Sequence, residues 1–202
     1  MKHKKVISDL YNILESQLSN KLTYHSISHT KDVHRVCQFY IEHYNIKGVD
    51  KELLNIAAVG HDVGFTKVYV NHEDVSSSIT AEIMESYRYS NSHVEIVQEL
   101  IMSTRIPQNP GSFLAQILCD ADLDYLGRDD FIKIGNRLKK EWINYDIVPN
   151  NAPDFNDIQI GFLKNHFYHT DYALEHREPK KRNSLQNLIQ LTTVKKERQR
   201  DN

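Results

Sequence analysis

The chain has 202 residues, of which 40% are hydrophobic and 26% are charged, with a formal net charge of -2. This length is enough to bury a core of its own, and the near-neutral balance disfavours nucleic acid or an acidic membrane as a partner. With only Cys37 and Cys119 as cysteines, we expect neither a disulfide framework nor a cysteine-rich zinc site. We expect a reduced protein in the cytoplasm, without a signal peptide or a membrane span.

Apolar residues recur at helical spacing along most of the chain, and breakers are scarce, with seven Gly and five Pro. This pattern predicts an all-α fold in a single domain over residues 1–202. Ser28 is expected to cap the second helix, and the charged end from Lys195 to Arg200 is expected to fray. The predicted helices cover about 4–19, 28–41, 53–59, 72–87, 92–103, 113–118, 129–146, 157–169 and 181–195. A polar loop is expected over about 150–157.

The continuous apolar run that ends at Val59 is followed by Gly60, His61, Asp62, Val63 and Gly64. Neighbouring His and Asp side chains at the end of a buried helix have no shared structural role. A divalent ion binds imidazole nitrogen and carboxylate oxygen together. The doublet is therefore a candidate metal site.

Further candidate ligands stand elsewhere in the chain. His25 and His29 are four residues apart, with His29 expected inside a helix and His25 just ahead of it. Asp120 and Asp122 alternate with apolar residues, and carboxylates in an apolar run are costly to bury without a partner. The alternative interpretation of these aspartates is a solvated helix end.

These residues, in the order His, His-Asp, Asp, resemble the signature of the HD-domain metal-dependent phosphohydrolases. The resemblance covers about residues 22–130 and rests on three stretches, 24–33, 57–64 and 117–123. It implies an HD-domain helical bundle with a C-terminal helical extension over about residues 150–196. It also implies a metal-ligand set of His29, His61, Asp62 and Asp122, with Asp120 as the alternative to Asp122.

The same resemblance implies a reaction. A bound divalent ion would activate water and offset the charge on a phosphoryl group, and Mn, Fe, Ni, Co, Zn or Mg all suit these ligands. His25 resembles the proton-donating His of cyclic-nucleotide phosphodiesterases, and imidazole titrates near neutral pH. We therefore expect His25 and Asp62 to be catalytic in the hydrolysis of a small, nucleotide-like phosphoester.

Residues around these stretches are candidates for a second ion or for phosphate binding. His72 and Glu73 stand where two-metal members often place a His, but Met102-Ser103-Thr104-Arg105 replaces a further His pair. One tightly held ion is therefore expected. The phosphate-binding candidates, with Arg105 first and assigned as catalytic, are Arg105, Lys67, Thr104 and Arg128.

Two alternatives to an enzyme remain open at this point. The chain would be a non-catalytic HD domain that binds a nucleotide or a protein, or the segment after Asn150 would serve to dock a partner or to form a homodimer. A tight ligand that is never turned over would favour the first alternative, and a changed oligomeric state on truncation near Pro149 would favour the second.

Overall fold

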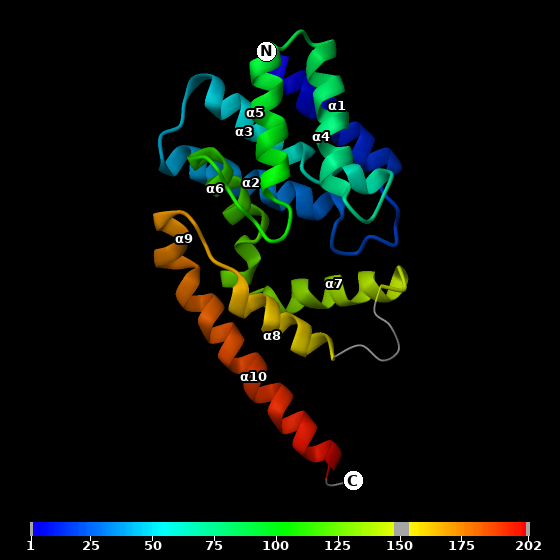
Figure 1. Ribbon diagram of the computed structural model, residues 1–202, viewed down its shortest axis with the longest axis vertical. Helices are drawn as coiled ribbons and strands as arrows, with labels where there is room; N and C mark the ends of the chain where they lie inside the picture. Colours follow the sequence, from blue (N-terminus) through cyan, green and yellow to red (C-terminus); the bar gives the residue numbers. More distant parts are fainter. Residues whose placement is uncertain (1, 148–153, 201–202) are drawn as a thin grey trace. The chain divides into compact units, whose positions relative to one another are not determined.

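The computed structural model describes residues 2–147 and 154–200, and this part of the chain contains helices and no strand (Figure 1). The predicted all-α fold class is confirmed. The chain divides into two compact units, residues 1–122 and 123–202. The single domain and its extension from about residue 150 stay predictions.

The first unit is a helical bundle around one buried helix, α3. Its elements are α1 (Lys2–Gln17), α2 (Ile27–His43), α3 (Gly48–Gly60), η1 (Val63–Thr66), α4 (His72–Ser86), α5 (Asn91–Ser103) and α6 (Phe113–Asp122). Helix α3 packs against α1, α2, α4, α5 and α6 (Figure 1). Every residue from Leu53 to Gly60 is buried, as the continuous apolar run predicts. The end of α3 therefore lies inside the unit.

A chain of polar contacts fixes α1 and α3 against α2. The Tyr11 hydroxyl lies 2.8 Å from His34 Nδ1, and His34 Nε2 lies 2.9 Å from Asn55 Oδ1. Burial lowers the pKa of His34, so its ring is neutral at pH 7 and carries one N–H. Because the Asn55 amide nitrogen donates to the Lys51 carbonyl, Asn55 Oδ1 accepts from His34 Nε2–H, and Tyr11 donates to Nδ1. This contact sets the position of α2, which carries His29, relative to α3.

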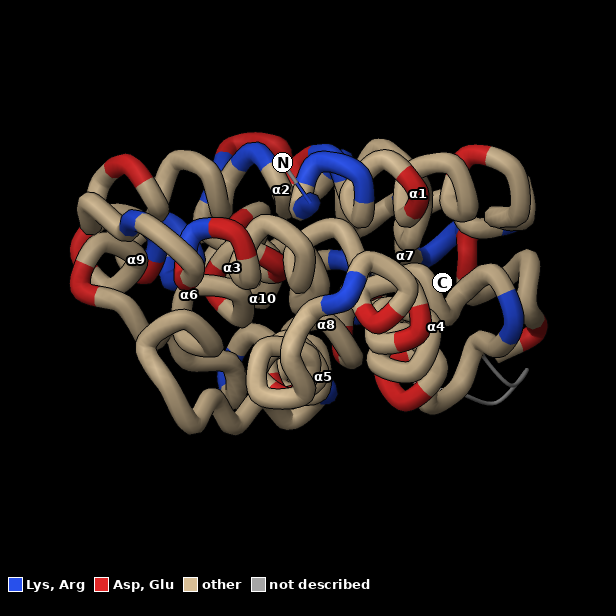
Figure 2. The backbone as a smooth tube through the Cα atoms, turned by 90° about the horizontal axis from the view of Figure 1, so that it is seen from above, with Lys and Arg blue, Asp and Glu red and all other residues tan. Residues whose placement is uncertain are grey.

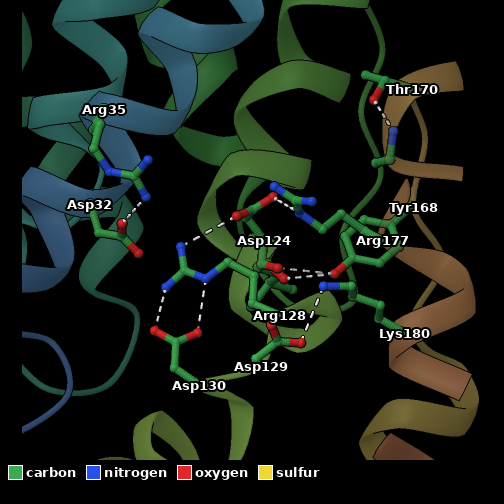
Figure 3. A network of polar contacts seen from close by, with 12 residues as sticks. Asp32, Arg35, Asp124, Arg128, Asp129, Asp130, Tyr168, Thr170, Arg177 and Lys180 are labelled. Atoms are coloured by element: carbon green, nitrogen blue, oxygen red, sulfur yellow. Dashed lines mark hydrogen bonds and ion pairs between the residues drawn. The ribbon is translucent and has the colours of Figure 1, made fainter. Parts of the chain in front are cut away.

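The second unit contains η2 (Asp124–Gly127), α7 (Phe131–Asn144), α8 (Phe155–Asn165), α9 (Asp171–His176) and α10 (Glu178–Arg200). Helix α10 packs along α8 and against η2. Asp124, on η2, is bonded to the residue between α9 and α10: it is 2% exposed and accepts from Arg177 Nε at 2.6 Å, and also from Arg128 Nη1 at 3.3 Å (Figure 3). Arg128 also pairs with Asp130, and the Tyr168 hydroxyl lies 3.4 Å from the Asp124 carbonyl oxygen (Figure 3).

Some helix ends differ from the prediction. Ser26, not Ser28, occupies the N-cap position of α2, because the chain becomes helical from Ile27. Helix α8 ends at Asn165, and the separate helix α9 was not predicted. Helix α10 continues to Arg200, where fraying was expected. Of the loop predicted over about 150–157, residues 150–153 lie outside the described part of the chain. The rest differs from the prediction, because α8 begins at Phe155 with Asp154 as its N-cap.

Helices α4, α5 and α6 carry acidic residues and no Lys or Arg, whereas α7 is mainly basic, and Figure 2 shows both signs spread over the described chain. This distribution matches the small net charge of -2. Every helix in the part of the chain that the structure describes is too short or too polar to span a bilayer.

Candidate metal centre

The His61-Asp62 doublet follows directly from the end of α3. His61 continues the helical backbone, with its N–H bonded to the Ala57 carbonyl at 2.9 Å, and Asp62 leads into η1. Because the end of α3 is buried, both side chains are delivered to the interior: His61 is 1% exposed and Asp62 is 4% exposed. Polar side chains at this depth need partners.

Helices α2 and α6 supply these partners. His29 Nε2 lies 3.1 Å from Asp122 Oδ1 and 3.4 Å from Asp62 Oδ2. His61 Nε2 lies 3.4 Å from Asp62 Oδ2, 3.5 Å from Asp122 Oδ1 and 3.4 Å from His29 Nε2. We call His29, His61, Asp62 and Asp122 the four-residue cluster. The structure thus brings together the four side chains that the resemblance implied as ligands.

The tautomer of His61 is set by the backbone. Nδ1 lies 3.0 Å from the Ala58 carbonyl oxygen, which can only accept, so Nδ1 carries the N–H. In the neutral ring, the lone pair of Nε2 then points into the cluster. Metal-binding histidines are commonly oriented by such a bond from the other ring nitrogen to a backbone carbonyl.

The electrostatics of the cluster keep both carboxylates negative. Burial by itself would raise the pKa of Asp62, but His61 and His72 hold it well below its usual range. Burial would likewise raise the pKa of Asp122, and His29 and His61 lower it instead. Burial would lower the pKa of His61, but the Asp62 and Asp122 carboxylates raise it well above the usual value. Ionised carboxylates are the form that binds a cation.

The geometry fits a divalent ion. Donor atoms that surround one ion at about 2.0–2.2 Å lie roughly 3–3.5 Å from one another, and the His–His distance and the four His–Asp distances of the cluster run from 3.1 to 3.5 Å. Asp62 Oδ2 is buried and accepts no hydrogen bond from the described residues. His29, His61 and Asp122 each offer one ligand atom, and these three atoms all lie within 4.8 Å of one another. A divalent metal would satisfy these atoms, and two imidazoles with carboxylates suit Mn, Fe, Co, Ni or Zn.

The second oxygen of Asp62 faces His72. His72 Nε2 lies 3.2 Å from Asp62 Oδ1, and His72 Nδ1 lies 3.8 Å from Glu73 Oε2. His72 is the first residue of α4, and Glu73 is 7% exposed. The two candidates for a second ion are therefore close to the cluster on one side of Asp62.

His25 lies in the loop ahead of α2, as predicted, and it is surrounded by rings. Its ring centroid is 6.1 Å from that of His29 and 4.6 Å from that of Tyr24. It also stacks on Phe65, with centroids 4.1 Å apart. The contact with His29 places His25 beside the cluster. Because His25 is half-buried, its ring still reaches solvent.

The predicted phosphate-binding groups of the first unit already have partners. Arg105 Nη2 lies 2.5 Å from Asp74 Oδ2, and Arg105 Nε lies 3.5 Å from Glu73 Oε2. Lys67 Nζ donates to Gln17 Oε1 at 2.9 Å. The Thr104 hydroxyl donates a hydrogen bond to the Ile101 carbonyl at 2.8 Å, and Thr104 is 5% exposed. A phosphate would therefore compete with these contacts.

The two remaining candidates are Asp120 and Arg128. Asp120 is fully buried on α6, but the group of ligand atoms contains Asp122 and not Asp120. Arg128 belongs to the second unit, where Asp124 and Asp130 hold its guanidinium (Figure 3). Their predicted roles stay predictions.

Sequence reasoning missed Phe65 and Asp74. Phe65 contacts two of the candidate histidines, and Asp74 forms the short ion pair with Arg105. Phe65 follows Asp62 by three positions, but the sequence alone does not indicate which rings it meets. Asp74 pairs with a residue 31 positions away, which no local pattern predicts.

Comparison with known proteins gives one match, which carries no functional description. The chain is 32% identical over 105 residues to a protein of Clostridium beijerinckii (strain ATCC 51743 / NCIMB 8052) that is described only as an uncharacterized protein. The match covers 50% of this chain and 65% of that protein. No family model matches the chain, and no solved structure matches it. The case for function therefore rests on the site itself.

Proposed function

We propose that this protein is a metal-dependent phosphohydrolase of the HD-domain type, acting on a phosphoester of a small, nucleotide-like molecule. One observation carries the proposal: two imidazoles, from α2 and the end of α3, lie 3.4 Å apart, and the carboxylates of Asp62 and Asp122 each lie 3.1 to 3.5 Å from both of them. The order of these residues along the chain, and their resemblance to HD-domain motifs, support the choice of this reaction and substrate class.

His29, His61, Asp62 and Asp122 would hold the ion. When bound, a divalent ion would supply a Lewis acid that makes water a better nucleophile and offsets charge on the phosphoryl group. The chain itself orients these ligands. The Ala58 carbonyl fixes the His61 ring, and His72 holds the second oxygen of Asp62.

His25 would donate a proton to the leaving oxygen. Its ring lies next to that of His29, and it is half-buried, so it can take up a proton from solvent after each cycle. Arg105 would contact phosphate only by exchanging one of its two carboxylate partners, Glu73 or Asp74, for the substrate.

The test combines metal analysis with a substrate screen. The purified protein is reconstituted with Mn²⁺, its metal content is measured by elemental analysis, and it is assayed on a panel of phosphomonoesters, phosphodiesters and nucleoside triphosphates. We expect His61→Ala and Asp62→Ala to lose the ion, and to lose hydrolysis by more than the roughly 10–100-fold that removal of an outer-shell partner costs.

Matched controls come from the same unit. His43→Gln changes an exposed histidine in the last turn of α2, and Asp50→Asn changes an exposed carboxylate in the first turn of α3. Both variants should keep the ion and the activity. A wild-type protein that binds Mn²⁺ but leaves the whole panel intact would refute the enzyme proposal and favour a binding module.

A further inference from the structure

Phe65 lies on a short turn that is fixed against the rest of the first unit. Its backbone N–H bonds to the Asp62 carbonyl at 3.1 Å, within η1. The preceding Gly64 N–H donates to Ser76 Oγ on α4 at 2.8 Å. The Phe65 side chain is 7% exposed. The ring is therefore held at a defined place beside the doublet.

The Phe65 ring stacks on two imidazoles that come from different elements. Its centroid is 4.1 Å from that of His25, at an interplanar angle of 23°, and 3.9 Å from that of His72, at 24°. The two imidazole centroids are 6.0 Å apart. Tyr69 packs edge-on against Phe65 at 5.3 Å and supports it. One phenyl ring thus contacts the candidate proton donor and the imidazole that faces Asp62.

We infer that Phe65 is a positioning residue that fixes the His25 and His72 rings in the orientations that the site needs. Its effect on activity rests on the proposed function, whereas its effect on the two rings does not. A proton donor must keep its nitrogen aimed at one atom, and small errors in such alignment slow reactions strongly. Stacking on a buried ring restricts the rotation of both imidazoles about their side-chain bonds.

The ring orientations can be measured without any substrate. In NMR spectra of the full-length protein, with and without Zn²⁺, the stacked phenyl ring should shift the ring C–H signals of His25 and His72 upfield. His25→Gln and His72→Gln assign the two sets of signals. In Phe65→Leu both sets should move toward the positions of an unstacked imidazole, and in Phe65→Tyr they should return. Signals of either histidine that stay unchanged in Phe65→Leu would overturn the inference.

Activity and metal content give the second readout. Phe65→Leu should keep the metal content of wild type, because the four-residue cluster is intact, while kcat falls about 10–100-fold and KM changes little. Phe65→Tyr should recover most of kcat. Phe113→Leu, at an exposed aromatic residue on α6, is the matched control and should change neither. Loss of the ion together with activity, or full activity in Phe65→Leu, would contradict the inference.

Two further outcomes are separable. If Phe65→Leu does not fold, Phe65→Met makes the same comparison with a longer, more adaptable side chain. If the wild-type protein hydrolyses no phosphoester, the proposed function fails, but the NMR comparison still decides whether Phe65 holds the two imidazoles.

Discussion

At the scale of single residues, one backbone contact sets the orientation of the His61 ring in the cluster. The Ala58 carbonyl accepts a hydrogen bond from His61 Nδ1–H, which leaves Nε2 aimed at His29, Asp62 and Asp122. The two carboxylate oxygens of Asp62 have different neighbours: Oδ2 faces His61 in the cluster, and Oδ1 faces His72. His29, His61 and Asp122 thus offer one atom each to a common group, and Asp62 Oδ2 lies 3.4 Å from both imidazoles. Small substitutions should therefore have separable effects.

Asp122 and Asp120 provide a matched pair of carboxylates on one helix. Asp122→Asn should lose the bound Mn²⁺, because its oxygen is one of the atoms that face His29 and His61. Asp120→Asn should keep the ion, since the α6 carboxylate that lies against both imidazoles is that of Asp122. Elemental analysis and isothermal titration with Mn²⁺ measure both. The reverse result, with the ion lost only in Asp120→Asn, would show that the choice of Asp122 is wrong.

The proposed role of His25 predicts a dependence on the leaving group. His25→Gln should lower kcat about 10²–10⁴-fold for an alkyl phosphoester, whose leaving oxygen needs a proton. The loss should be much smaller for a 4-nitrophenyl ester, which leaves without protonation. Metal content should equal that of wild type. An equal loss for both esters would argue against a proton donor and for a role in structure or in binding.

At the scale of elements, the site depends on how closely η1 approaches α4. A Cβ added at Gly64 would lie 2.8 Å from Ser76 N and 2.9 Å from Ser76 Oγ, and would collide with the His72 carbonyl oxygen. These are backbone atoms and a buried hydroxyl, which have no room to move. Glycine is therefore required for His72, at the start of α4, to reach Asp62.

Gly64→Ala should destabilise the protein by about 1–3 kcal/mol, the usual cost of overpacking. It should also weaken metal binding, because the collision pushes η1, and with it the neighbouring Asp62, away from α4 and from the two imidazoles of the cluster. Urea unfolding and titration with Mn²⁺ measure the two effects. Gly161→Ala is the control: nothing lies within 4 Å of its added Cβ, and it stands inside α8. That variant should be as stable as wild type or gain up to about 1 kcal/mol.

At the scale of the whole molecule, the core of the first unit covers both thiols. Cys37 and Cys119 are each 0% exposed. Burial raises the pKa of Cys119 to about 12, against a smaller lowering by its contact with Ser103. At pH 8 only about one Cys119 thiol in ten thousand would then be ionised, and the thiolate is the reactive form.

Iodoacetamide should therefore label Cys119 far more slowly in the folded protein than in guanidinium, as measured by mass spectrometry. Added Mn²⁺ should slow labelling further in wild type, because an ion that binds only the folded state stabilises it. Asp122→Asn should show no such protection. Rapid labelling of the native protein, unchanged by Mn²⁺, would contradict both the burial and the linkage to the metal site.

The local sequence accounts well for the helices and poorly for their ends. Helical periodicity predicted the all-α class. The continuous apolar run predicted that α3 is buried, because a helix that is apolar on every face is stable only in the core. The cap of α2, the separate helix α9 and the extension of α10 were missed. Such ends depend on which backbone groups find partners after packing, which propensity does not encode.

The chemistry of the candidate ligands was also readable in the sequence. A His-Asp doublet that directly continues a buried apolar run is carried into the interior, and polar or charged side chains there need partners. By itself, therefore, the sequence determined an all-α protein with a His/Asp site at the end of its central helix.

Only the tertiary structure decided which side chains share that site. Asp120 and Asp122 differ by two positions on a helix, about 200° of rotation, so the packing of α6 determines which of them faces His29 and His61. The packing of α4 against α5 likewise decided that Arg105, predicted to bind phosphate, pairs with Glu73 and Asp74. Contacts between distant segments depend on how helices pack, and no spacing along the chain specifies that geometry.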